Sequence, residues 1–212
     1  MIKENDFIEM DYVAKIKGEG IFDLTVEDVA RKNNIYNKDY KYKPIIICVG
    51  KKDIVKGLDD QLIGKNLGKY SIEVNPEEGF GKKDAKLIKL IPTKEFTKQN
   101  LRPMPGMQLN LDGYMGKIVS VAGGRTLVDF NSPLAGKELV YDIEIKRIVT
   151  DKKEQLQGFL NILFKNIKFE INDNEANVEI KDIDEAMKKE LEKEIIERIK
   201  VKKVTFNIND VT

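Results

Sequence analysis

Hydrophobic and polar residues alternate over three short stretches of the chain, a pattern typical of strands with one buried face. In the first stretch, Met10, Tyr12, Ala14 and Ile16 are separated by single residues, most of them charged. The same period of two recurs over residues 70–74 and again over residues 139–145. The pattern therefore predicts three half-buried strands that lie far apart in the sequence.

A continuous apolar run at residues 45–49 differs from these alternating stretches. Such a run indicates a strand that is buried on both faces. It is followed by Leu58 and Leu62, whose spacing of four predicts a short helix with one apolar side. Gly50 and Gly57 interrupt the passage between strand and helix. Together these features predict a sheet that curls around one short helix.

Residues 87–128 separate the two halves of this predicted sheet and contain Pro92, Pro103 and Pro105. Residues 117–121 and 125–129 form an apparent hairpin, with its turn at residues 122–124. The segment is also rich in flexible and apolar side chains, which suit the recognition of varied apolar segments. The alternative is that they fill a small core. The candidate substrate-binding residues are Phe96, Leu101, Met104, Met107, Leu109, Leu111, Tyr114 and Met115.

The pattern changes to helical spacing after Asp151. The first predicted helix carries Leu156, Phe159, Leu160, Leu163 and Phe164, and Asp151 with Glu154 forms a capping-box pattern. Strands are expected near residues 168–171 and 177–180. Asp182 and Glu185 are then expected to cap a second helix, and Val204 and Phe206 to lie on a last strand. Residues 151–212 are thus predicted to be a separate α+β domain.

A domain of this size is marginal by itself, so a homodimer formed through it is plausible. Thr25, in the N-terminal part, is expected to cap a short helix that runs through Ala30. The residues from there to Lys43 are expected to form a long surface flap.

Composition limits the possible partners and the cellular compartment. The 212 residues include 37 Lys and Arg against 36 Asp and Glu, a net charge of +1, which gives no reason to expect a nucleic-acid partner. No apolar run approaches the roughly 20 residues of a membrane span, and the first residues do not resemble a signal peptide. The single Cys48 lies within the apolar run, as expected in a reducing cytoplasm.

The chain has no histidine, which excludes several kinds of chemistry. Ser-His and Cys-His catalysis, an imidazole base and His-ligated zinc are all impossible. The glycines do not have the spacing of a phosphate-binding or dinucleotide-binding loop. We therefore expect no metal and no cofactor, and a reaction that involves little proton transfer.

Four motifs, in the right order, resemble those of FKBP-type peptidyl-prolyl cis-trans isomerases. Residues 49–57, VGKKDIVKG, are similar to the pocket segment of that family. Residues 75–81, NPEEGFG, resemble its P-x-x-A-Y-G turn, and residues 139–145 resemble its closing strand. Residues 129–136, DFNSPLAG, look like the point where SlyD-type and archaeal members re-enter the isomerase domain after an inserted domain, with Ser132 in place of the usual His.

The resemblance implies an α+β fold in which an antiparallel FKBP sheet curls around a short helix. It also implies that residues 1–86 and 129–150 form the isomerase domain. Residues 87–128 would then be an inserted client-binding domain, and residues 151–212 an accessory domain. The substrates would be unfolded, proline-containing polypeptides.

The resemblance further implies a catalytic pocket with Asp23 as the polar group at its edge. Val55 would offer its backbone N–H to a substrate carbonyl. Leu58 stands where many members have Trp, and Phe80 replaces a Tyr. Each apolar residue, taken alone, could equally be an ordinary core residue, and a holdase with an inactive pocket is the alternative function. The implied pocket walls are Tyr12, Phe22, Ile45, Ile54, Val55, Leu58, Phe80 and Tyr141.

Overall fold

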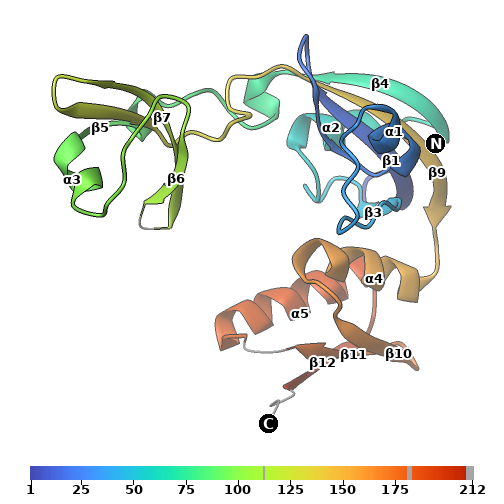
Figure 1. Ribbon diagram of the computed structural model, residues 1–212. Helices are drawn as coiled ribbons and strands as arrows, with labels where there is room; N and C mark the ends of the chain where they lie inside the picture. Colours follow the sequence, from blue (N-terminus) through green and yellow to red (C-terminus); the bar gives the residue numbers. More distant parts are fainter. Residues whose placement is uncertain (112, 181–182, 209–212) are drawn as a thin grey trace. The chain divides into compact units, whose positions relative to one another are not determined.

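The structure is a computed structural model that describes residues 1–111, 113–180 and 183–208 (Figure 1). The chain divides into two compact units. The first contains residues 1–74 and 139–212, and the second contains residues 75–138.

The first unit is built on an antiparallel sheet of β1 (Phe7–Ile16), β2 (Ile21–Leu24), β3 (Ile45–Cys48), β4 (Gly68–Val74) and β9 (Leu139–Val149). Strand β1 pairs with β9 along its whole length, while β2 and β3 pair with different parts of β1. The three strands predicted from alternation correspond to β1, β4 and β9, so that prediction is confirmed.

The short helix predicted after the apolar run is α2 (Lys56–Leu62). Its Leu58 and Leu62 are both buried. The helix contacts β4, and the Gln61 side-chain amide donates a hydrogen bond to the Glu73 carbonyl at 3.0 Å. The α+β class and the antiparallel sheet are therefore as predicted.

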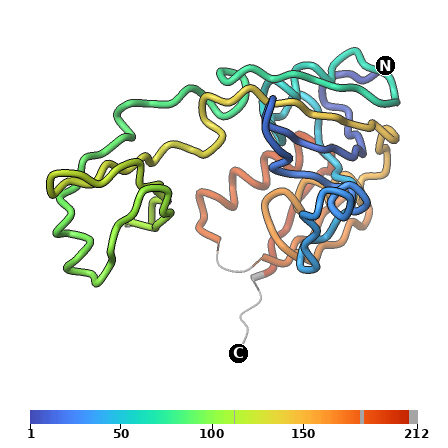
Figure 2. The backbone as a smooth tube through the Cα atoms, turned by 45° about the horizontal axis from the view of Figure 1, so that its top comes forward, coloured from blue at the N-terminus to red at the C-terminus, as the bar shows by residue number. Residues whose placement is uncertain are grey.

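Strand β3 is covered by the C-terminal segment, which sets the arrangement of the first unit. Helix α4 (Lys152–Leu163) approaches β3 so closely at Gly158 that an added Cβ would lie 2.6 Å from the Ile46 Cβ. Phe7, Cys48 and Val149 belong to the same hydrophobic cluster as the buried residues of the C-terminal helices. Figure 2 shows the orange and red C-terminal segment beside the blue-to-cyan strands of this unit.

This packing differs from the separate domain that was predicted for residues 151–212. The compact unit joins those residues to residues 1–74 and 139–150. The reason is that the apolar run at 45–49 needs a cover on its second face, and α4 supplies it. The division into three domains stays a prediction, and the C-terminal segment shares a hydrophobic cluster with Phe7 and Cys48 of the first sheet.

The secondary structure of the C-terminal segment follows the sequence pattern. Strands β10 (Lys168–Asn172), β11 (Glu175–Ile180) and β12 (Lys203–Ile208) form a three-stranded sheet, in which β12 runs parallel to β11. Helix α5 (Glu185–Ile199) joins these two strands. Within the described residues, none of the helices is long and apolar enough to cross a membrane.

The caps of the C-terminal helices agree with the prediction only in part. The Asp151 carboxylate accepts a hydrogen bond from the Glu154 N–H at 2.9 Å, as the capping pattern predicts. For α5, the cap is Asp184, whose carboxylate accepts from the Met187 N–H at 2.8 Å. Glu185 is the first residue of that helix, and Asp182 lies outside the described residues.

The predicted cap at Thr25 is wrong. Helix α1 (Glu27–Lys32) begins after Val26, which makes no side-chain capping bond. Thr25 is instead almost fully buried and bonds to strand β1. A buried hydroxyl needs a partner, and the Tyr12 N–H and the Asp11 carboxylate of β1 provide two.

The second unit contains a four-stranded antiparallel sheet. Its elements are η1 (Pro76–Glu78), η2 (Ala85–Leu87), β5 (Ile88–Pro92), α3 (Thr93–Thr97), β6 (Gln108–Leu111), β7 (Tyr114–Ala122) and β8 (Arg125–Asp129). The strand order is β5-β8-β7-β6. The predicted hairpin is β7–β8, turned at Gly123 and Gly124, whose φ angles of 56° and 72° favour glycine.

The chain enters and leaves the second unit through two segments that are bonded to each other. The Asn131 side chain accepts a hydrogen bond from the Asp84 N–H at 2.8 Å, and the Gly136 N–H donates to the Gly81 carbonyl at 2.8 Å. These bonds place both connecting segments in the compact unit, so its bounds, 75 and 138, are wider than the predicted 87 and 128.

Candidate active site

Asp23, the predicted polar group of the pocket, accepts hydrogen bonds from its neighbours Tyr12 and Leu24. It lies on β2, opposite Ala14 of β1. The Tyr12 hydroxyl donates to Asp23 Oδ2 at 2.7 Å, and the Leu24 N–H donates to Asp23 Oδ1 at 2.9 Å. An ionised carboxylate has about four acceptor positions, so each oxygen can still accept from, or face, a bound group. The Asp23 carboxylate is therefore held in position while it keeps acceptor positions open.

Thr25 locks the end of β2 to β1 and thereby sets the position of Asp23. Its hydroxyl accepts from the Tyr12 N–H at 2.9 Å and donates to Asp11 Oδ1 at 2.7 Å. Its own N–H donates to the Tyr12 carbonyl at 3.0 Å. The sequence analysis missed this role because a Thr ahead of a helix resembles a cap.

The rings of Tyr12, Phe22 and Tyr141 form a cluster on β1, β2 and β9. Tyr141 on β9 pairs across the sheet with Ala14, whose small side chain leaves room beside it. The Tyr141 ring centroid is 6.4 Å from that of Tyr12 and 6.2 Å from that of Phe22, which it meets edge-on at 88°. Distances and tilts of this kind are favourable for aromatic pairs. The structure thus places Tyr12, Phe22 and Tyr141 in one aromatic cluster, with Asp23 bonded to Tyr12, and their role as a catalytic pocket stays a prediction.

Burial extends the pH range over which the phenols around Asp23 stay protonated further into the alkaline region. Burial, together with the hydrogen bond to Asp23 and the charge of that carboxylate, raises the pKa of Tyr12 far above its ordinary value. Burial and the same charge raise the pKa of Tyr141 to about 12. Because both groups stay protonated near neutral pH, the Tyr12 hydroxyl remains a donor to the carboxylate.

Tyr40 is a neighbour of Asp23 that the sequence analysis missed. It lies in the segment 33–43, which was predicted only as a surface flap. Burial and the charge of Asp23 raise the pKa of Tyr40, and its ring packs at 4.8 Å against that of Tyr42. No periodicity marks this residue, and the only available signal is the local abundance of tyrosine.

The predicted floor lies on the loop between β3 and α2. Ile54 and Val55 are half-buried, and Leu58, which follows them on α2, is buried. Val55 directly precedes α2, and no described group accepts a hydrogen bond from its backbone N–H. The proposed bond from that N–H to a substrate carbonyl stays a prediction. Ile45, at the start of β3, is half-buried and pairs with Met10.

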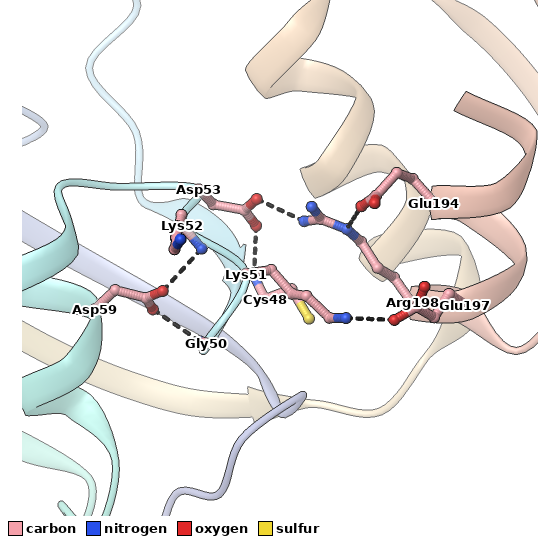
Figure 3. A network of polar contacts seen from close by, with 9 residues as sticks. All are labelled: Cys48, Gly50, Lys51, Lys52, Asp53, Asp59, Glu194, Glu197 and Arg198. Atoms are coloured by element: carbon pink, nitrogen blue, oxygen red, sulfur yellow. Dashed lines mark hydrogen bonds and ion pairs between the residues drawn. The ribbon is translucent and has the colours of Figure 1, made fainter. Parts of the chain in front are cut away.

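The start of this loop is tied down by Asp59 of α2, which is buried (Figure 3). Its two carboxylate oxygens accept from the Gly50 N–H at 2.9 Å and from the Lys52 N–H at 2.8 Å. Charge-assisted bonds to backbone donors are among the stronger hydrogen bonds in proteins. The loop that carries the floor residues is thus fixed to the helix that follows it.

Phe80 belongs to the second unit, on the turn that follows η1. Its side chain is 41% exposed, so it is accessible to a ligand. Its place in the pocket wall stays a prediction.

The candidate substrate-binding residues of the second unit fall into two groups. Phe96 and Leu109 are buried in its core, and Leu101, Met107 and Leu111 pack against that core. Met104, Tyr114 and Met115 are 59%, 72% and 60% exposed. The first group therefore fills the small core, which was the alternative interpretation, and only the second group is open to a client.

The outer face of the second sheet adds apolar residues that the sequence analysis did not select. Ile88 and Leu90 alternate with the core residue Ile91 along β5, so they point away from the core. Both are exposed, and so is Val119 of β7. Leu90 pairs across the sheet with Leu127 of β8.

No group of three or more His, Cys, Asp or Glu side chains that could hold a metal ion occurs within residues 1–111, 113–180 and 183–208.

Comparison with known proteins decides the family. Over 155 residues the chain is 32% identical to a short-type peptidyl-prolyl cis-trans isomerase of Methanocaldococcus jannaschii, an alignment that covers 73% of this chain and 98% of that protein. Residues 89–134 match a family model described as the IF domain of FKBP26. The chain belongs to the FKBP-type peptidyl-prolyl cis-trans isomerases.

Bacterial members of this FKBP-type family are also similar. The chain is 29% identical over 132 residues to an FKBP-type 16 kDa isomerase of Escherichia coli, covering 60% of this chain and 87% of that protein. It is 31% identical over 109 residues to the SlyD isomerase of Haemophilus influenzae, covering 49% of this chain and 56% of SlyD. The predicted resemblance to SlyD-type and archaeal FKBPs is confirmed.

Proposed function

We propose that this FKBP-type isomerase accelerates the rotation of X–Pro bonds in unfolded polypeptides that its second unit holds. The observation that supports this most is the Asp23 carboxylate, held at 2.7 Å by Tyr12, a member of the cluster of three aromatic rings. The cytoplasm is the proposed location, since the single cysteine is buried and unpaired.

The chemistry of the pocket follows from the electronic structure of the amide. Rotation about an X–Pro bond faces a barrier near ~20 kcal/mol because conjugation must be broken. The twisted amide is less dipolar than either planar form, so an apolar pocket stabilises it relative to the ground state. Each ~1.4 kcal/mol of such preference accelerates the reaction tenfold, and no proton has to move.

Each polar group then has a definite task. The Val55 N–H binds a substrate carbonyl and fixes the peptide on one side of the rotating bond. The Asp23 carboxylate faces the carbonyl carbon of the twisting amide, which is the positive end of its dipole. Tyr12 holds that carboxylate at its position while the amide turns.

The proposed client surface consists of exposed apolar residues of the second unit. It includes Met104, Tyr114 and Met115 from the predicted set, together with Ile88, Leu90 and Val119. Methionine and aliphatic side chains adapt to varied apolar segments without demanding a fixed sequence. The client would be any unfolded chain with exposed apolar residues near a proline.

A protease-coupled assay with a prolyl tetrapeptide tests the catalytic half of the proposal. Asp23→Ala is expected to reduce kcat/KM several-fold or more, because it removes the fixed charge and leaves the aromatic walls. The control is Asp28→Ala, a change of an exposed carboxylate on α1. Full activity in a folded Asp23→Ala protein would refute the role of Asp23. A parent protein without activity that still prevents aggregation would favour the holdase.

A further inference from the structure

The loop that carries the pocket floor is held by the C-terminal helix α5 as well as by α2. Asp53, directly before Ile54 and Val55, is the residue through which α5 acts. The Arg198 guanidinium of α5 donates from Nη1 to Asp53 Oδ1 at 2.6 Å (Figure 3). The other oxygen, Asp53 Oδ2, accepts from the Cys48 N–H at 2.8 Å.

The ion pair is buried, which distinguishes it from the surface pairs of this protein. The Arg198 and Asp53 side chains are only 9% and 5% exposed. Glu194, one turn earlier in α5, accepts from Arg198 Nε at 2.6 Å, and the guanidinium carbon lies 4.6 Å from the Phe159 ring centroid. Arg198 is thus fixed by three neighbours, and its planar group has little freedom to move.

A second contact joins the same helix to the same loop. The Lys51 ammonium donates to Glu197 Oε1 at 2.6 Å. In Figure 3 both contacts reach the loop from α5, whereas Asp59 reaches it from α2. The loop is therefore held between two helices that are more than a hundred residues apart in sequence.

We infer that Arg198 is a positioning residue for the isomerase reaction, which sets the place of Ile54 and Val55 through Asp53. The inference rests on the proposed pocket floor. If the guanidinium is removed, Asp53 Oδ1 loses its partner while remaining buried, and the loop must rearrange to solvate it. Displacing a substrate-binding N–H by even a fraction of an ångström weakens both binding and alignment.

The test compares the full-length parent with Arg198→Leu, Arg198→Lys and Glu154→Gln, using the tetrapeptide assay well below the unfolding temperature. Glu154→Gln is the matched control, because Glu154 of α4 pairs with Arg147 of β9 at 2.7 Å and does not touch the loop. Arg198→Leu is expected to lower kcat/KM about tenfold, chiefly through a higher KM, since Val55 contacts the substrate. Arg198→Lys is expected to lower kcat/KM less than Arg198→Leu does, because it keeps a cation near Asp53.

A purely stabilising role of Arg198 predicts a different result. If Arg198 only stabilises the fold, Arg198→Leu and Glu154→Gln lower the unfolding temperature and leave KM at the parental value. That result overturns the inference. Should Arg198→Leu fail to fold, Asp53→Asn replaces it, since the amide oxygen can still accept from the Cys48 N–H but no longer pairs with the cation. An unchanged KM in Asp53→Asn would overturn the inference equally.

The outcome can be separated from failure of the proposed function. Asp23→Ala is measured in the same series. If Asp23→Ala abolishes activity while the Arg198 variants keep the parental KM, the proposed pocket is supported and the positioning role of Arg198 is refuted. If the parent shows no turnover, the proposed pocket itself is refuted.

Discussion

The residues around Asp23 show how a carboxylate can be held fixed without any histidine. Tyr12 supplies the donor, and its raised pKa keeps that donor protonated. Thr25, directly after β2, binds both Tyr12 and Asp11 and so ties the end of β2 to the middle of β1. A site of this type needs rigid placement more than a proton donor of tuned acidity, and the bonds around Asp23 provide such placement.

The neutral tyrosines of the site predict a loss of stability at alkaline pH. The folded-state pKa of Tyr141 is about 12, above the ordinary value of 10.0. The unfolded chain therefore releases this proton at lower pH than the folded chain does. The contribution is fully present below pH ~10 and is lost as the pH rises towards 12. We expect the stability difference between the parent and Tyr141→Phe to change above pH 10 and to stay constant below it.

Urea unfolding at several pH values checks this expectation. Tyr36→Phe is a suitable control, because that ring is exposed and stacks on Tyr42. A pH-independent difference for Tyr141→Phe up to pH 11 would contradict the expected coupling. The isomerase activity itself should be flat between pH 6 and 9, because no group in the proposed mechanism has to gain or lose a proton.

At the scale of elements, local patterns predicted the strands and helices, while the contacts between them were not predictable. The strand at residues 139–145 and the hairpin at residues 117–129 could be predicted because each pattern depends only on the residues of its own segment. The docking of α4 on β3, the role of Thr25 and the place of Tyr40 each depend on a partner far away in sequence. The apolar run at 45–49 did indicate burial on both faces, but it did not reveal which element covers the second face.

Gly158 offers a test of that docking. In an isolated helix, Gly→Ala stabilises by about 1 kcal/mol. Here an added Cβ would lie 2.6 Å from the Ile46 Cβ and 3.0 Å from the Ile46 carbonyl oxygen, and neither the strand backbone nor a branched side chain can easily yield. Gly158→Ala is therefore expected to destabilise the protein by about 1–3 kcal/mol.

The measurement is urea unfolding, with Lys153→Ala on the exposed side of α4 as the control. A stabilised Gly158→Ala protein would show that α4 does not lie this close to β3. A loss confined to Gly158→Ala would support the shared core of the C-terminal segment and the isomerase sheet.

At the scale of the whole molecule, the predicted homodimer through residues 151–212 stays a proposal. The reason for it is no longer the small size of the segment. The segment is not an isolated small domain, because it shares a hydrophobic cluster with Phe7 and Cys48. It still exposes Leu163 and Met187, at 51% and 53%. We expect light scattering to give a mass that rises towards twice that of the chain with concentration.

Leu163→Lys should shift that equilibrium towards the monomer, because a charge in an apolar interface is costly to bury. Leu67→Lys is the matched control, since Leu67 is 52% exposed and lies outside the C-terminal segment. A mass that stays at one chain across the whole concentration range would rule the dimer out.

The second unit provides the last prediction, which separates client holding from catalysis. A prolyl pocket meets an unfolded chain only briefly unless a nearby surface retains it. Retention raises the effective concentration of the client at the pocket to about millimolar. A free tetrapeptide has too few apolar residues to gain from such a surface, so the two kinds of substrate should respond differently when the surface is removed.

Two variants remove it. In one, a short glycine-containing turn replaces residues 89–128 between Ile88 and Asp129, which face each other across β5 and β8. In the other, Leu90→Ser and Val119→Ser make the outer sheet face polar, with Lys94→Ser on α3 and Lys98→Ser directly after α3 as the control pair. Both should turn over tetrapeptides within a few-fold of the parent.

The same variants should slow the proline-limited refolding of a whole protein by a much larger factor and lose the ability to suppress its aggregation. The serine pair is the sharper of the two, because it leaves the core around Phe96 and Ile118 intact. If the shortened protein refolds whole clients as fast as the parent does, the client is held elsewhere. If only the serine pair behaves like the parent, the client surface lies on the second unit but away from its outer sheet face, where Met104 and Tyr114 become the residues to test.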